Sequence, residues 1–171
     1  PYELGMLRGS VTVGATNLHG TIQRSDDTVN FFSSRGPTRG AYFDAGGVRR
    51  LDNLIKPDLV APGNKIIGAL PTDNQSMNHY AYLPATYPQL PTVAGWTPAQ
   101  GKSVMTLSGT SVAAPVVSGA AALLLQANPG LTPPLIKALL QYTAQPLAGA
   151  SLVHQGAGLI VDEHRRRHLA A

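Results

Sequence analysis

The feature that most constrains the fold is a long stretch without charge, since no Asp, Glu, Lys or Arg occurs between Lys102 and Lys137. A membrane span is one interpretation of such a stretch. However, Pro115 and two later proline-containing turns interrupt it, and its most apolar run, Val112 to Leu125, is shorter than the roughly 18 residues that a span requires. The sequence therefore favours a helix buried in a protein core and predicts no membrane span.

Short, turn-punctuated elements are expected elsewhere. The chain is 43% hydrophobic and 13% charged, which is typical of a globular protein, and its 18 Gly and 14 Pro favour a loop-rich α/β protein over a helical bundle. Residues 38–56 lack periodicity and are expected to form a surface loop, and 71–100 a long surface insertion. Strands are predicted at 10–15, 29–33, 57–63, 65–70 and 103–107, and helices at 112–126, at 132–143 and from about 161 to 168.

The net charge of +4 does not indicate a nucleic-acid partner. Basic residues are scattered along the chain, and the one dense cluster, Arg165-Arg166-Arg167, lies beside Asp162 and Glu163. A solvated helix face explains that pattern better than a nucleic-acid footprint.

Cysteine is absent, so the chain has neither a disulfide framework nor a thiolate metal site. The sequence begins at Pro1 without a charged and then apolar leader, so no signal peptide is visible, and the start is expected to be a cut inside a longer protein.

The segment Ser108-Gly109-Thr110-Ser111 joins a predicted strand to the apolar helix. A serine at a helix N-terminus lies beside unpaired backbone N–H groups and the positive end of the helix dipole, so an oxyanion formed by attack of its Oγ on a carbonyl would be stabilised there. Gly109 would let a substrate backbone approach closely. Alternatively, Ser108, Thr110 or Ser111 caps a buried helix, and the turn and helix alone favour that interpretation.

The motif from Ser108 to Pro115, followed by Ser118-Gly119 and a run of Ala and Leu, resembles the nucleophile motif of the subtilase family, peptidase family S8. Further landmarks resemble the same family in the same order, namely Val11–Ala15, Phe31–Pro37, Lys56–Gly63, Asn128–Thr132 and Gly156–Ile160.

The resemblance implies an α/β fold in which residues 1–171 form the C-terminal portion of a subtilisin-like catalytic domain, a mostly parallel sheet flanked by helices. Residues 71–100 are then an insertion and 109–127 the nucleophile helix. Ser111 is the implied catalytic serine, with Gly109 and Thr110 close to the oxyanion and the substrate.

The rest of the family's catalytic apparatus does not match this sequence. The resemblance places the triad Asp and His and the oxyanion-hole Asn before the strand that matches Val11–Ala15, hence before Pro1. His19 is followed by Gly20 and Thr21, but it comes after that strand, and a turn role is favoured. His79, His154, His164 and His168 have no motif around them. Because a serine without its base is a weak nucleophile, the chain alone is expected to be inactive.

The implied function is serine-type endopeptidase activity on polypeptide substrates, completed by the missing N-terminal part of the domain. The alternative is a catalytically inactive subtilase-like module used for binding or as a scaffold. The family resemblance implies a secreted or cell-envelope location. No cofactor is expected to be required. Structural calcium is possible in the family, but the spacing of the loop carboxylates Asp26, Asp27, Asp44 and Asp52 matches no dedicated calcium loop, and no metal site is predicted.

Overall fold

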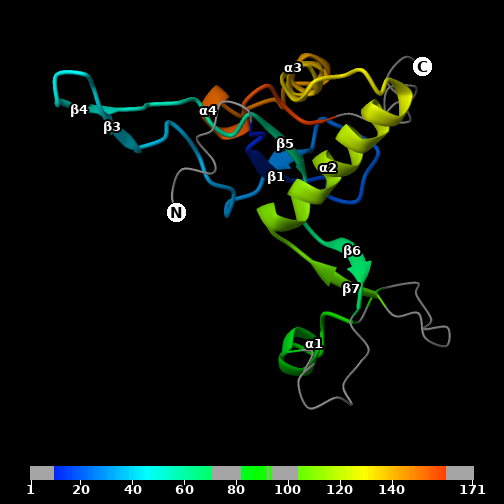
Figure 1. Cartoon of the computed structure of the whole chain (residues 1–171). Helices are drawn as coiled ribbons and strands as arrows, with labels where there is room; N and C mark the ends of the chain where they lie inside the picture. Colours follow the sequence, from blue (N-terminus) through cyan, green and yellow to red (C-terminus); the bar gives the residue numbers. More distant parts are fainter. Residues whose placement is uncertain (1–9, 71–81, 92, 94–103, 161–171) are drawn as a thin grey trace, which may run out of the picture. The chain divides into compact units, whose positions relative to one another are not determined.

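The structure is a computed structural model that describes residues 10–70, 82–91, 93 and 104–160. The helix predicted from about 161 to 168 and much of the insertion therefore lie outside the described residues. The contacts divide the chain into two units, one formed by 1–64 with 109–171 and the other by 65–108. The strands are β1 Val13–Asn17, β2 Thr28–Val29, β3 Ala41–Phe43, β4 Arg49–Leu51, β5 Leu59–Pro62, β6 Ile66–Ala69 and β7 Val104–Leu107, and the helices are α1 Tyr82–Thr86, α2 Thr110–Ala127, α3 Pro133–Thr143 and α4 Leu152–Gln155 (Figure 1).

The first unit contains a three-stranded sheet in the order β2-β1-β5. β1 and β5 are parallel and in register from the pair Val13 and Leu59 to the pair Thr16 and Pro62. β2 adds two antiparallel pairs at the end of β1, and Leu159 extends the other side through a parallel bridge to Val60. The predicted α/β class is confirmed, and the strands predicted at 10–15 and 57–63 correspond to β1 and β5.

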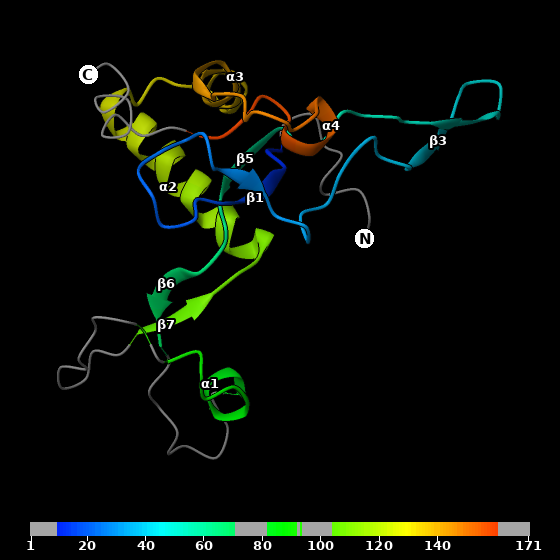
Figure 2. The same cartoon turned by 180° about the vertical axis from the view of Figure 1, so that it is seen from behind.

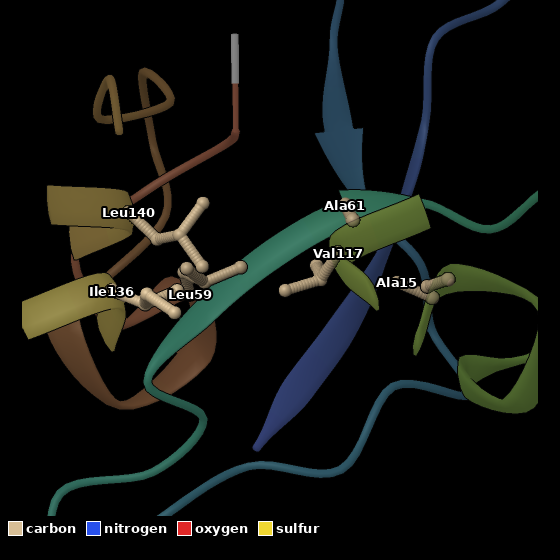
Figure 3. Close-up of a cluster of buried hydrophobic side chains, with 7 residues drawn as sticks. Ala15, Leu59, Ala61, Val117, Ile136 and Leu140 are labelled. Atoms are coloured by element: carbon tan, nitrogen blue, oxygen red, sulfur yellow. The ribbon is translucent and has the colours of Figure 1, made fainter. Parts of the chain in front are cut away.

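Side chains alternate across β5, so this short strand contributes to two cores. Leu59 and Ala61 lie on one face with residues from β1, α2 and α3, whereas Val60 packs with Leu147 and Leu159 in a smaller cluster. Figure 3 shows the larger cluster, in which Leu59 lies close to the α3 side chains. Leu59 is completely buried, and burying a leucine contributes about 1.5–3 kcal/mol to folding. The β1–β5 pair is therefore the framework on which the helices rest.

Helix α2 packs on this framework with only one side. Ala113 and Val117, four residues apart, are buried, and the helix contacts both β1 and β5 (Figures 1 and 2). On the outer side Leu123 is 67% exposed. The expectation of a buried helix therefore holds for one face only. By length and composition α2 could cross a membrane, but core helices of soluble proteins meet the same two criteria, so a single such helix does not establish a span.

The strand predicted at 29–33 is largely wrong. β2 ends at Val29, and the chain then turns, with the Ser33 N–H donating to the Asn30 carbonyl at 3.0 Å. Phe31 is 89% exposed and Phe32 is 37% exposed, so neither aromatic side chain is buried. The Ser33 hydroxyl instead accepts the N–H of Ala15, in the middle of β1, at 3.0 Å.

Residues 38–56 are not an irregular loop, because they contain the antiparallel hairpin β3–β4. The Asp44 side chain accepts the N–H groups of Gly46 and Val48 and so closes the turn, and Gly47 adopts a positive φ of 75°. The short helix α4 was also not predicted.

The second unit is built on the antiparallel pair β6–β7, whose register runs from Ile66 and Leu107 to Ala69 and Val104. The strands predicted at 65–70 and 103–107 are confirmed over these residues. Within the described part of the 71–100 insertion, α1 forms a short helix, and the Thr106 N–H donates to the Leu90 carbonyl at 2.9 Å.

Candidate active site

The turn that carries Ser111 starts the helix without a side-chain cap. Gly109 occupies the N-cap position, and its carbonyl accepts the N–H groups of Val112 and Ala113 at 3.1 and 3.2 Å. Ser108 lies one residue before the cap, where its hydroxyl accepts the Lys65 N–H at 2.9 Å. The capping interpretation of this turn is therefore wrong, because glycine has no side chain with which to cap.

Ser111 is the second residue of α2 and is exposed to solvent. Within the described part of the chain, neither its hydroxyl nor its backbone N–H makes a hydrogen bond. The N–H is one of the unpaired donors at the positive end of an 18-residue helix that has no acidic residue in its first turn. The hydroxyl and a donor suited to a developing oxyanion thus occur on the same residue.

A hydrogen bond fixes the turn to the end of β5. The Gly109 N–H donates to the Gly63 carbonyl at 2.8 Å, and the Gly63 N–H donates to the Thr16 carbonyl of β1 at 3.0 Å. Thr16 is fully buried, so this chain of bonds runs from the sheet core to the start of α2.

The described histidines each contact other polar side chains. The ring nitrogens of His19 lie 3.4 Å from the Asn17 amide and 3.2 Å from the Thr28 hydroxyl. His154 lies 3.4 Å from an Arg35 guanidinium nitrogen. His79, His164 and His168 lie outside the described residues.

The loop carboxylates also have protein partners. Asp26 accepts the Thr21 hydroxyl, Asp52 accepts the Thr38 hydroxyl, Asp27 lies 3.7 Å from the Arg24 guanidinium and Asp44 binds Arg50. The Arg50 hydrogen bond, helped by backbone N–H groups, lowers the pKa of Asp44 despite a small opposing effect of burial. Across the described ranges, no three His, Cys, Asp or Glu side chains gather as metal ligands would.

One charged cluster escaped the sequence analysis. The Asp58 carboxylate, at the entrance to β5, contacts the ammonium groups of Lys56 at 2.7 Å and Lys137 at 2.9 Å and accepts the Thr12 N–H at 2.7 Å. Burial raises the pKa of Asp58, but the bonds from Lys56, Thr12 and Lys137 outweigh it, so the pKa lies below its ordinary value of 3.8. Lys137 comes from α3, far along the chain, and nothing in the local sequence indicates that contact.

An α/β framework that presents an exposed serine at a strand-to-helix turn, beside unpaired N–H groups, is an arrangement found in serine hydrolases. The subtilase family model matches residues 4–158 of this chain. The chain therefore belongs to the subtilase family of subtilisin-like serine proteases.

Relatives and solved structures agree with this assignment. The chain is 36% identical over 137 residues to serine protease AprX of Bacillus subtilis, covering 80% of this chain and 25% of AprX. It is 37% identical over 116 residues to subtilisin-like protease SBT2.4 of Arabidopsis thaliana, covering 68% and 11%. The CspB protease of Clostridium perfringens matches 98% of the chain and 27% of its own length, with a TM-score of 0.58 and 27% identity. The chain thus spans a quarter or less of the curated relatives named here.

Proposed function

We propose that Ser111 is the nucleophile of a serine endopeptidase whose Asp and His are supplied by a segment of the same protein that precedes this chain. The observation that carries the proposal is the exposed Ser111 hydroxyl at the uncapped N-terminus of α2, in a chain of the subtilase family. The partners of the described histidines, Thr28 for His19 and Arg35 for His154, support a base supplied by another part of the protein.

In the proposed reaction the Ser111 Oγ attacks the carbonyl carbon of a peptide bond while the His removes the hydroxyl proton. The carbonyl oxygen becomes an oxyanion, for which the Ser111 N–H is a donor, assisted by the dipole of α2. The C–N bond then breaks, the His returns the proton to the leaving amine, and water hydrolyses the acyl-enzyme. Thr110 and Gly109 form the wall of the turn that the substrate backbone approaches.

The chain without its preceding segment is proposed to be inactive, because a serine hydroxyl with no base reacts slowly and triad members act as a unit. Polypeptides are the proposed substrate class, and secretion or the cell envelope the proposed location, both by analogy with the family. The alternative, an inactive subtilase-like binding module, requires that the complete protein lack the Asp or the His.

The test is labelling of the full-length protein with a fluorophosphonate, followed by peptide mapping. We expect label on Ser111, no label on the Ser111→Ala variant, and unchanged label on Ser118→Ala. Ser118 is the matched control because it is an exposed serine of the same helix whose hydroxyl donates to the Ala114 carbonyl at 3.2 Å. A folded full-length protein that takes no label at Ser111 would contradict the endopeptidase proposal and favour the inactive module.

A further inference from the structure

Gly63, the residue after β5, is packed against the turn that carries Ser111. It is buried, its carbonyl accepts the Gly109 N–H at 2.8 Å, and its own N–H donates to Thr16. A methyl group on Gly63 would lie 2.7 Å from the Ala15 Cβ, 2.9 Å from the Gly109 carbonyl oxygen and 3.1 Å from the Ala113 Cβ. Real Cβ atoms essentially never approach other atoms below 3.0 Å, so two of these contacts could not persist.

Space, and not backbone conformation, is what requires glycine here. Gly63 is not among the described residues with a positive φ, so alanine could adopt its backbone angles. The obstacles are a backbone oxygen and the Cβ atoms of two alanines, none of which can rotate away. Ala15 and Ala113 are both completely buried, so the surrounding core offers little room to yield.

On this basis, we propose that Gly63 is a positioning residue for the nucleophile, because its lack of a side chain lets the start of α2 lie directly against the end of β5. The inference rests on the proposed role of Ser111. Both peptide groups of Gly109 are fixed, one by the bond to Gly63 and the other by the bonds that begin the helix, and Ser111 follows two residues later. Any displacement of Gly109 therefore moves Ser111 with it.

The contacts give the size of the expected displacement. To bring the two shortest distances up to an ordinary 3.4 Å, the turn and the core must separate by about 0.5–0.7 Å. Catalytic groups must be held within about 0.5 Å, and a misplacement of 1 Å can cost 10²-fold in rate. We expect Gly63→Ala to lower kcat about 10- to 100-fold and to change KM by less than about threefold, because binding of remote substrate groups does not depend on the position of Ser111.

The experiment measures kcat and KM of the full-length protein, with active sites counted by fluorophosphonate titration. Gly68→Ala is the matched control, since a Cβ on Gly68 meets nothing within 4 Å, and its kcat should equal that of wild type. The double variant Gly63→Ala with Ala15→Gly removes the 2.7 Å contact and should recover at least about threefold of the lost kcat, as expected for residues in direct contact. Ala15→Gly alone measures the cost of the second change.

A structural glycine with no positioning role would give a different result. Gly63→Ala would then reduce the fraction of titratable sites or the melting temperature while kcat per titrated site stayed at the wild-type value, and this outcome would overturn the inference. Crystal structures of wild type and Gly63→Ala provide a readout independent of activity, with Ser111 expected to shift by about 0.5 Å relative to β1 and β5. If wild type takes no fluorophosphonate label but Ser111 is displaced in Gly63→Ala, the proposed function fails while Gly63 still positions Ser111. If Ser111 is not displaced in Gly63→Ala, the positioning role of Gly63 is contradicted.

Discussion

Replacing Asp58 by asparagine should destabilise the protein far more than the same change at an exposed ion pair. The side chains of Asp58, Lys56 and Lys137 are only 8, 11 and 15% exposed, so all three charges are largely withdrawn from water. Asparagine keeps the shape of Asp58 but not its charge, which leaves two ammonium groups without their counter-ion.

The expected loss of unfolding free energy follows from the two lysine ammonium groups that Asp58→Asn leaves without a counter-ion. Breaking a buried ion pair costs about 3–5 kcal/mol, and we expect about 3 kcal/mol because each lysine retains some access to solvent and the asparagine oxygen can still accept the Thr12 N–H. The matched control is Asp44→Asn, which removes the carboxylate partner of Arg50. The Arg50 side chain is 59% exposed, and exposed pairs contribute little, so the control should lose much less stability.

The assay is unfolding in urea, followed by circular dichroism, in a Ser111→Ala background of the full-length protein so that self-digestion cannot interfere. Urea is chosen because it is uncharged and does not screen the ion pairs as guanidinium would.

The pH dependence has a definite sign. The pKa of Asp58 is lowered by folding, so its contribution to stability is complete above the unfolded pKa of about 3.9 and is lost as the pH falls through the folded value. The difference between wild type and Asp58→Asn should therefore be constant from about pH 7 to 5 and shrink below about pH 4. A loss no greater than that of the Asp44 control, or a difference that persists unchanged at low pH, would refute this reasoning.

Two further predictions concern the chain between α3 and Ile160, each measured as the free energy of unfolding in urea in the same background. Gly156→Ala should cost more than about 4 kcal/mol, because φ is 60° and the new Cβ would overlap the Asp58 carbonyl oxygen. The control Gly149→Ala, where φ is 75° but the space for a Cβ is open, should cost about 1 kcal/mol. Equal losses for the two variants would show that the space around the Cβ is not the determinant. Gln155→Ala should cost about 2–3 kcal/mol, because the Gln155 side chain accepts one buried backbone N–H and donates to two carbonyls. The control Gln126→Ala, at an exposed glutamine, should change the free energy of unfolding by no more than about 0.5 kcal/mol. A loss under about 1 kcal/mol for Gln155→Ala would contradict this account.

Local patterns were sufficient to predict the elements that form the framework. β-branched residues bounded by turn signals indicated β1 and β5, and the apolar run after Ser111 indicated α2. The hairpin β3–β4 was missed because its turn is closed by the Asp44 side chain, and all six of its strand residues are exposed, so they show no alternation of apolar and polar residues. The strand predicted at 29–33 extends beyond β2 because Val and Phe favour a strand by propensity, whereas the chain turns after Val29.

The contacts that hold the fold and the turn of the candidate site together join segments remote in sequence. Asp58 meets Lys137, and Gly63 meets both Ala15 and Ala113, and a single sequence contains no signal for such pairs. The resemblance indicated Ser111 from its motif, yet the same sequence could not reveal that Gly109, and not a hydroxyl, begins the helix.

Because Gly109 and not Ser111 is the N-cap of α2, the capping and the catalytic interpretations of Ser111 predict different effects of its replacement on stability. If Ser111 capped α2, its replacement by alanine would cost about 0.5–2 kcal/mol. In the structure Ser111 lies inside the first turn, is exposed and makes no hydrogen bond within the described residues, and alanine has the higher helix propensity there.

We therefore expect Ser111→Ala to leave the free energy of unfolding unchanged or to raise it by up to about 0.5 kcal/mol, while it abolishes fluorophosphonate labelling. Urea unfolding of full-length wild type and Ser111→Ala, both in the presence of the same reversible inhibitor of low affinity and extrapolated to zero inhibitor, provides the comparison. Since helix formation does not require a serine at this position, a gain in stability with a loss of reactivity would mean that the residue serves chemistry and not folding. A loss of 1 kcal/mol or more would instead return Ser111 to a structural role.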